Sequence, residues 1–214
     1  TAREMADRYR HNLPLPRLIA NGADFDFFHK GTVHPALSAL QKPVIGYYGA
    51  IAPWFNLELV IDLAKQRPSF TFILIGAVHG IDIGPLLELP NIHLLGEKNY
   101  RELPGYLAGF DVCLIPFRIN ALTKAVDPVK MYEYCSQGKP VISSRMPEIL
   151  HLDGIIRFAT DTPSFLRAID DALAEPGTEQ GNAQREKRIS FARENTWGAR
   201  TSAFQSAVYD AYQS

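Results

Sequence analysis

Short apolar runs alternate with helical patterns along most of this chain. The runs are rich in β-branched and aromatic residues, which predicts strands at 43–49, 70–76, 91–96, 111–117, 140–144 and 154–159. Helical patterns separate them, at 56–66, 85–89, 101–109, 128–137 and 162–175. The strands are apolar throughout, as strands covered on both faces are. We therefore predict an α/β fold: a parallel sheet with helices on both faces and right-handed crossovers.

Both ends of the chain depart from this alternation. Residues 1–10 read as a helix that starts without methionine, so we expect a fragment of a longer protein. Residues 15–28, "LPRLIANGADFDFF", predict a strand, an Asn-Gly turn and an extended linker, which suggests a domain boundary within 21–40. Two further helical segments, broken near 195–198, complete the chain.

Composition narrows the class of protein. Apolar residues make up 46% and charged residues 21%, as in a soluble globular protein, and the net charge of −1 argues against a nucleic-acid binder. The sequence has no apolar run long enough for a transmembrane segment. Cys113 and Cys135 each fall inside an apolar element, which indicates reduced core thiols and a cytoplasmic setting. Neither belongs to a metal-ligand pattern, so no metal site is predicted.

Ligands of open parallel sheets bind beyond the carboxyl ends of the strands. The relevant loops are 49–56, 76–80, 96–100, 117–127 and 143–148. They contain no G-x-G-x-x-G fingerprint, no P-loop and no G-x-S-x-G elbow.

The helix in "DPVKMYEYCSQGKP" (127–140) has well-marked ends. Asp127 suits the N-cap and Pro128 the first helical position, while Gly138 suits a left-handed C′ residue and Pro140 stops the helix. Apolar residues cover most of the circumference, so we expect the helix to be nearly buried. Its polar residues form one narrow stripe: Lys130, Glu133 and Gln137.

Lys130 lies in the first turn, where the helix dipole disfavours a cation by about 0.3–1 kcal/mol. The free N–H groups of that turn are also a ready anion site, and a bound phosphate would make the lysine a second contact. The alternative is an ion pair between Lys130 and Glu133 at i,i+3 spacing, stabilising by about 0.2–0.5 kcal/mol.

"YEYCSQGKPVISS" resembles the donor-binding signature of the retaining nucleotide-sugar glycosyltransferases of the GT-B fold, the group 1 family (family 4). "IANGADFDFF" is similar to the family's interdomain linker, "FTFILIG", "NIHLLG" and "FDVCLIPF" to its successive strands, and "FARENTW" to its C-terminal helix. Nearly the whole chain is covered in the right order. The resemblance implies one Rossmann-like half of a GT-B fold.

The resemblance also implies domains and a mechanism. Residues 1–30 would be a remnant of the N-terminal domain plus linker, 31–195 the donor-binding domain, and 196–214 a helix that packs back towards the N-terminal domain. The reaction would move a hexosyl unit, with retention, from a nucleoside diphosphate sugar to an acceptor hydroxyl in polysaccharide or glycoconjugate synthesis. No metal or other cofactor is expected.

The sugar or lipid-linked acceptor would bind through the missing N-terminal domain, so we expect this fragment alone to be inactive. The protein would be cytoplasmic. Peripheral attachment to the inner face of the membrane, through the N-terminal domain, is a second option. Two alternatives stay open: a non-catalytic α/β module that binds a nucleotide or another anionic metabolite, and a nucleotide-sugar epimerase of the same fold.

Several residues take family roles. Glu133 occupies the position of the glutamate that contacts the ribose. The family's first glutamate would fall at Ala125, so that carboxylate is absent, and the nearby Asp127 is better used as the N-cap.

Residues 49–58 lack the cations with which the family commonly holds the pyrophosphate. Arg118, Lys124 and Lys130 are the replacements, with backbone N–H groups near Gly49 and Val129. As an alternative, Arg118 and Lys124 are solvated loop charges.

The nucleobase would lie at the loop formed by Gly96, Glu97, Lys98, Asn99 and Tyr100, whose amides would read the base edge. Trp54 would form one side of the cleft or, alternatively, pack on the domain surface. His79 would lie at its rim or be a plain loop residue.

Overall fold

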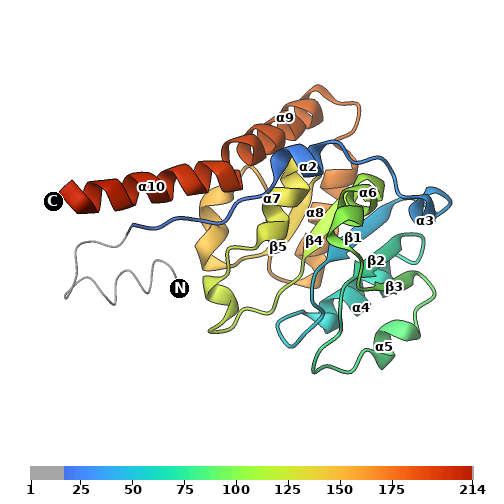
Figure 1. Cartoon of the computed structure of the whole chain (residues 1–214). Coiled ribbons are helices and arrows are strands. Elements are labelled where there is room, and N and C mark those ends of the chain that lie inside the picture. Colours follow the sequence, from blue (N-terminus) through green and yellow to red (C-terminus); the bar gives the residue numbers. More distant parts are fainter. Residues whose placement is uncertain (1–16, 214) are drawn as a thin grey trace.

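A computed structural model describes residues 17–213. Its centre is a six-stranded, fully parallel sheet with the order β3-β2-β1-β4-β5-β6 (Figure 1). The strands are β1 (Val44–Tyr48), β2 (Thr71–Ile75), β3 (Ile92–Gly96), β4 (Val112–Ile115), β5 (Val141–Ser144) and β6 (Arg157–Ala159). All residues of β1, β2, β4 and β5 are buried, in agreement with their largely apolar sequence. The predicted Rossmann-like α/β fold is confirmed.

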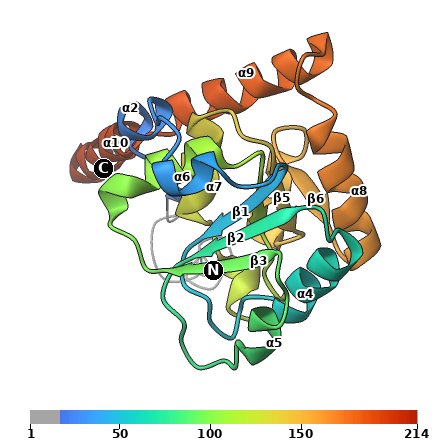
Figure 2. The same cartoon turned by 90° about the vertical axis from the view of Figure 1, so that its right-hand side faces the viewer.

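Helices cover both faces of the sheet (Figure 2). One face carries α4 (Leu57–Gln66), α5 (Gly84–Leu87) and α8 (Thr162–Leu173). The other carries α2 (Phe25–His29), α3 (Pro35–Ser38), α6 (Leu103–Gly109), α7 (Val129–Ser136) and α9 (Glu179–Glu194). Three short 3-10 helices lie in the connections, at Tyr100–Glu102, Thr123–Ala125 and Pro147–Leu152.

The strand order reverses between β1 and β4, which are neighbours although β2 and β3 separate them in sequence. Such a switch point opens a crevice beyond the carboxyl ends of the two strands. The loops after β1 and β4 therefore flank the crevice, and α7 follows the β4 loop. Cys113 on β4 and Cys135 on α7 are both fully buried free thiols, as predicted.

The segment before β1 differs from the sequence prediction. Residues 24–28 are not an extended linker, because Asp24 accepts the N–H of Phe27 and caps the short helix α2. Phe25 and Phe28 of this helix are buried in the same core as the sheet. Residues 17–22 form no strand, and the predicted helix at 1–10 lies outside the described residues.

The chain ends in two helices, and the predicted break near 195–198 is confirmed. α9 ends at Glu194 and α10 (Trp197–Gln213) begins after a bridge between Ala23 and Thr196. α10 extends away from the sheet and has no buried residue (Figure 1). Within residues 17–213, no helix combines the length and apolarity needed to cross a membrane.

Candidate functional site

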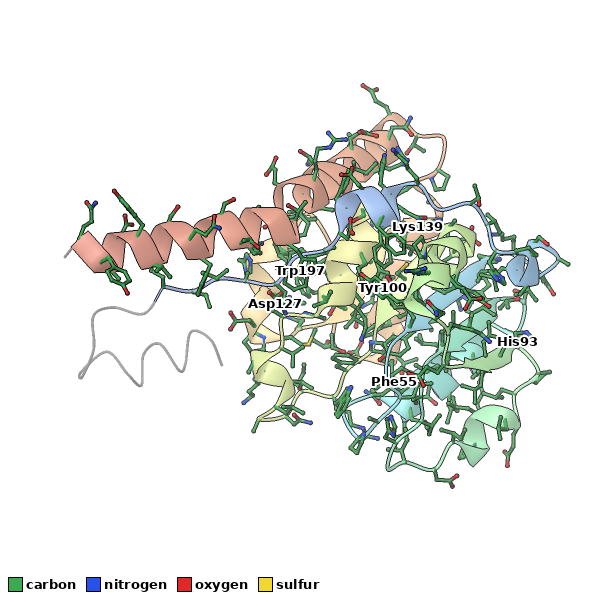
Figure 3. All side chains as sticks on the ribbon, in the orientation of Figure 1. Phe55, His93, Tyr100, Asp127, Lys139 and Trp197 are labelled. Carbon is green, nitrogen blue, oxygen red and sulfur yellow. The ribbon has the colours of Figure 1, made fainter. Side chains whose placement is uncertain are left out.

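α7 begins one residue later than predicted, and Asp127 is not its N-cap. Pro128 is the N-cap residue and provides no side-chain hydrogen bond. The Asp127 carboxylate, at the start of α7 (Figure 3), instead accepts the N–H of Asn21 at 2.7 Å and the hydroxyl of Tyr132 at 3.0 Å. Asp127 therefore ties the segment before α2 to α7. The N–H groups of Val129 and Lys130 have no hydrogen-bond partner within residues 17–213.

The C-terminal end of α7 is as predicted. Gly138 has φ 69°, and its N–H donates to Cys135 while Lys139 N–H donates to Tyr134, which is a Schellman motif. Residues 131–136 are all buried. The polar stripe of α7 therefore faces other parts of the protein, and the amide of Gln137 donates to the carbonyls of Phe28 and Pro104.

Lys130 reaches from α7 to the end of β1. Its Nζ lies 4.8 Å from the ring centre of Tyr47 and 5.0 Å from that of Phe117, and a β-carbon on Gly49 would lie 2.6 Å from Nζ. Burial lowers the pKa of Lys130 to about 8. Among the described residues no carboxylate forms an ion pair with it, so the alternative of a Lys130–Glu133 ion pair is contradicted. The amine is close to two aromatic rings and to the uncapped helix end.

Glu133 lies one turn further along α7 and is 4% exposed. Its Oε1 accepts the hydroxyl of Tyr100 at 3.2 Å. Burial raises the pKa of Glu133, although the hydroxyls of Tyr48 and Tyr100 and the charge of Lys130 act in the opposite direction. The Tyr48 hydroxyl is buried and has no hydrogen-bond partner of good geometry among the described residues.

Tyr100 connects this carboxylate to α2. Its ring stacks on Phe27 with centroids 5.5 Å apart and meets the edge of Phe28 at 5.4 Å. The sequence predicts Tyr100 at the nucleobase, and its contact with Glu133 was not predicted. Phe27 was not predicted either, because the segment that forms α2 reads as an extended linker. Tyr47 and Tyr48 could have been found, since they directly precede Gly49 at the end of a predicted strand.

The other predicted nucleobase residues form a tight turn after β3. Gly96 has φ 67°, a conformation that favours glycine. Asn99 accepts the N–H of Arg101 and donates its own N–H to Glu102, so that amide is not free to read a base. Glu97 is exposed and Lys98 is partly exposed. A nucleobase contact at this loop stays a prediction.

The remaining predicted phosphate ligands are less close together than expected. Gly49 N–H is not a free donor, because it bonds the carbonyl of Ile75 at 2.8 Å. Arg118 forms an exposed ion pair with Glu58 of α4. Lys124 is exposed in the 3-10 turn Thr123–Ala125, whose last residue occupies the position of the missing glutamate. A diphosphate contact would require Arg118 to leave its present partner.

The two predicted rim residues lie in the loops after β1 and β2. Trp54 packs against the core and its carbonyl accepts the N–H of Arg118, while His79 is exposed and its N–H donates to Ile51. The described part of the chain contains no group of three His, Cys, Asp or Glu side chains that could hold a metal ion.

Comparison with known proteins gives the family. The model of the glycosyl transferases group 1 family matches residues 42–175. The chain is 28% identical over 189 residues to TuaH of Bacillus subtilis (strain 168), whose name assigns it as a glycosyltransferase to teichuronic acid biosynthesis. That alignment covers 84% of this chain and 47% of TuaH, so the chain spans about half the length of this relative.

Solved structures show the same fold at low sequence identity. Sucrose-phosphate synthase from Thermosynechococcus elongatus has a TM-score of 0.72 at 18% identity, over 100% of this chain and 57% of that one. Anabaena HepE, solved with UDP and glucose, has a TM-score of 0.70 at 18% identity, over 92% of this chain and 57% of that one. Because the family match covers more than half of the sequence, this chain belongs to the group 1 glycosyltransferases of the GT-B fold.

Proposed function

We propose that this chain is the donor-binding half of a glycosyltransferase and that its crevice binds a nucleoside diphosphate sugar. One observation carries the proposal. A desolvated Lys130 amine lies above Gly49 at the uncapped end of α7, and a buried Glu133 lies one turn beyond it. The Lys130 amine and the end of α7 suit a diphosphate, and Glu133 suits the ribose that follows it.

The diphosphate would relieve two unfavourable features of this helix end. A cation at a helix N-terminus costs about 0.3–1 kcal/mol, and the free N–H groups of Val129 and Lys130 lack acceptors within the described chain. An anion at this position satisfies the N–H groups and restores the charge balance of Lys130. Arg118 and Lys124 are secondary candidates, because both are exposed at the same edge of the sheet.

The ribose would bind at Glu133. Ribose hydroxyls donate to a carboxylate, and burial makes such a charge-assisted bond stronger than in water. Tyr100 occupies one of the two Glu133 oxygens, so one ribose hydroxyl would replace or share that bond. The base would then extend towards the turn at 96–100.

The chemistry would be transfer of a hexosyl unit, with retention, to an acceptor hydroxyl in polysaccharide or glycoconjugate synthesis. Negative charge develops on the departing diphosphate, and Lys130 with the α7 N-terminus would stabilise it there. The family membership and the teichuronic acid assignment of TuaH support this reaction class, and the UDP complex of HepE supports the donor class. The acceptor would bind to a domain outside this chain.

Isothermal titration calorimetry with UDP, GDP and ADP tests donor binding. The wild-type chain should bind one of these nucleotides, and Glu133→Gln should weaken that binding about ten-fold or more, since a charged hydrogen bond contributes about 1.5–3 kcal/mol. Glu88→Gln is the matched control, because Glu88 is exposed and distant in the fold from α7. Absence of binding for all three nucleotides, or equal binding by wild type and Glu133→Gln, would overturn the assignment.

A transfer assay tests whether the acceptor site lies outside this chain. The 214-residue chain should release no UDP from UDP-sugars in the presence of oligosaccharide acceptors, because the acceptor site would lie elsewhere. Glycosylation of an acceptor by this chain alone would contradict that part of the proposal and leave donor binding untouched.

A further inference from the structure

A cavity of about 800 Å³ lies at the amino ends of the strands, whereas the donor crevice lies beyond their carboxyl ends. It is bordered by the residues that precede three strands: Pro43 before β1, Asp111 before β4 and Pro140 before β5. β1 is five residues long, so roughly 17 Å separate the amino end of the strand from its carboxyl end. The cavity is therefore a site in its own right and not an extension of the crevice.

The cavity lining carries more positive than negative charge. Four cations line it, Lys42, Lys139, Arg185 and Arg188, against two carboxylates, Asp111 and Glu175. Both carboxylates are already engaged. Asp111 accepts Lys42 and a backbone N–H, and Glu175 contacts Arg188 and a second arginine, each at 2.5 Å. Arg185 forms an exposed ion pair with Glu186, outside the lining, at 2.9 Å, so an anion near Arg185 would compete with that pair. Lys139 has no carboxylate partner in the described part of the chain.

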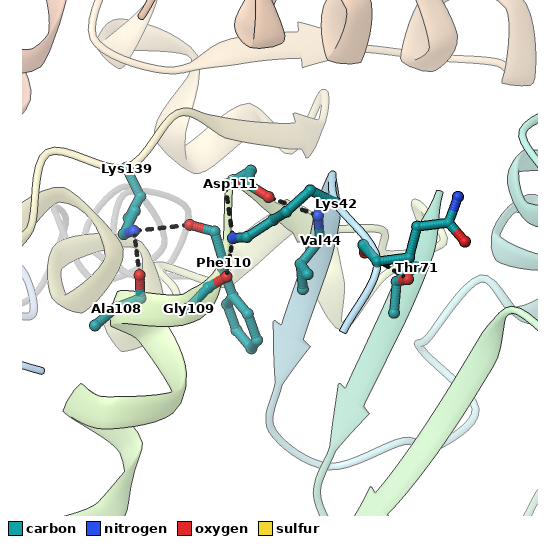
Figure 4. Close-up of polar contacts among 9 residues, drawn as sticks. Lys42, Val44, Thr71, Ala108, Gly109, Phe110, Asp111 and Lys139 are labelled. Atoms are coloured by element: carbon teal, nitrogen blue, oxygen red, sulfur yellow. Dashed lines mark hydrogen bonds and ion pairs between the residues drawn. The ribbon is translucent and has the colours of Figure 1, made fainter. Parts of the chain in front are cut away.

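Lys139 uses two of its three ammonium N–H groups in hydrogen bonds within residues 17–213. Its Nζ donates to the carbonyls of Ala108 at 2.9 Å and Phe110 at 2.7 Å (Figure 4). An ammonium has three N–H groups, and the third has no partner among residues 17–213. Burial lowers the pKa of Lys139, and the neighbouring charges of Lys42 and Arg185 lower it further against the pull of Asp111. An added anion would relieve this repulsion.

The rest of the lining is largely apolar. Phe70, Phe110 and Leu173 contribute side chains, together with Pro43 and Pro140. A volume near 800 Å³ falls in the range of small-molecule sites, which combine apolar walls with a few polar groups. An inorganic ion would leave those walls in contact with water, so the charge and the walls together favour an organic anion.

We propose that this cavity binds a small organic anion, a carboxylate, phosphate or sulfonate on an aromatic or aliphatic body, with the acidic group between Lys139 and Arg185. The proposal does not depend on the donor site, although the cavity includes Gln137 and Gly138 at the C-terminal end of α7.

Fluorescence titration of the full chain with 8-anilinonaphthalene-1-sulfonate tests the proposal. N-phenyl-1-naphthylamine is the matched neutral probe, because it keeps the aromatic body without the sulfonate. The sulfonate should bind at one site at least about five-fold more tightly than the neutral probe, as expected for one charge met by partly buried cations. Equal affinities would show that the cations do not recognise the anion and would overturn the proposal.

Substitutions in and around the cavity test where the sulfonate probe binds. Arg185→Gln should weaken sulfonate binding about three-fold, whereas Lys187→Gln removes an exposed charge from the same helix and should change nothing. Asn182→Trp places a bulky ring from an exposed position into the cavity and should abolish binding while all cations remain. Phe204→Ser, on the exposed face of α10, should have no effect.

Amide chemical shifts give the second measurement. The sulfonate should shift the N–H resonances of Gly138, Gly177 and Gly181, which line the cavity, in the wild type but not in Asn182→Trp. Full binding by a folded Asn182→Trp, loss on Phe204→Ser, or shifts confined to the residues near Gly49 would each overturn the assignment.

Discussion

The Tyr100 hydroxyl donates to Glu133 Oε1 at 3.2 Å, although the two residues are 33 positions apart in sequence. The ring of Tyr100 stacks on Phe27, so this bond links α2, the turn after β3 and α7. It also occupies one of the oxygens that a ribose would need. A donor ribose bound at Glu133, as proposed, would therefore compete with this contact.

Tyr100→Phe separates these two roles. The ring and its stacking on Phe27 remain, so only the hydrogen bond is lost, and the free energy of unfolding should fall by about 1 kcal/mol. UDP affinity should stay the same or increase, because Glu133 is released for the ribose. Urea denaturation and calorimetry measure the two effects, with the exposed Tyr212→Phe as control. A ten-fold loss of UDP affinity would instead show that the hydroxyl contacts the nucleotide directly.

Lys130→Met should stabilise the empty protein and impair its binding site. Burial lowers the pKa of Lys130, which means that its surroundings disfavour the charge. Methionine fills similar space between Tyr47 and Phe117 without a charge, so the free energy of unfolding should rise by about 0.5–2 kcal/mol. UDP affinity should fall at least about ten-fold, since a charged contact to phosphate is lost. A destabilised variant with unchanged UDP binding would contradict both expectations.

The pH dependence of binding should follow Lys130. Its pKa is lowered from 10.5 to about 8, so the empty site loses this charge as pH rises through 8. UDP affinity should therefore fall about ten-fold between pH 7.5 and 9.5, above the phosphate titration near pH 6. A diphosphate bound beside Lys130 would raise the pKa of Lys130, so binding near pH 8 should take up protons, which calorimetry in buffers of different ionisation enthalpy detects.

Two variants control this experiment. Lys130→Arg keeps its charge at every pH tested and should bind with little pH dependence, while Lys130→Met should bind weakly and equally at all pH values. The same lowered pKa makes the stability of the empty wild-type protein rise between pH 8 and 10.5, because the unfolded chain binds the extra proton there. A fall in UDP affinity that persists in Lys130→Arg would assign the titration to another group.

The sequence predicted the sheet well because its strands are buried on both faces. Such strands leave long apolar runs, and Gly138 marks the end of α7 because its positive φ favours glycine. The prediction was wrong for Asp127, which has the right residue type and position for an N-cap. The carboxylate instead accepts the N–H of Asn21, 106 residues away, and the hydroxyl of Tyr132 within α7, and no local pattern reveals the distant partner.

The candidate site was only partly predictable for a similar reason. Lys130 and Glu133 could be found because they are polar residues on an otherwise apolar helix. Arg118 was grouped with Lys130 on proximity in sequence, but its charge is engaged by Glu58, which comes from a different element. Tyr48 lies within an apolar run, and the sequence does not distinguish a tyrosine whose hydroxyl faces Glu133 from one that only fills the core.

The Glu175 carboxylate provides a last prediction, about stability. It contacts Arg157 and Arg188 at 2.5 Å each, and Arg188 is 2% exposed. Glu175→Gln leaves that guanidinium charge buried without a carboxylate, which should cost about 3–5 kcal/mol of unfolding free energy at pH 7. Asp170→Asn is the matched control, because Asp170 pairs with Arg67 at the same 2.5 Å distance on the surface and should cost less than about 1 kcal/mol.

The pH dependence of Glu175→Gln provides a second readout. Burial alone would raise the pKa of Glu175, but the hydrogen bonds and charges of Arg188 and Arg157 outweigh it and lower the pKa below 4.5. The contribution of Glu175 is therefore complete above pH 4.5 and is lost as pH falls through the lowered value. Urea denaturation from pH 7 to pH 3 should show the wild type and Glu175→Gln converging at the acid end. A constant difference across that range would mean that packing, rather than the ion pairs, accounts for the loss.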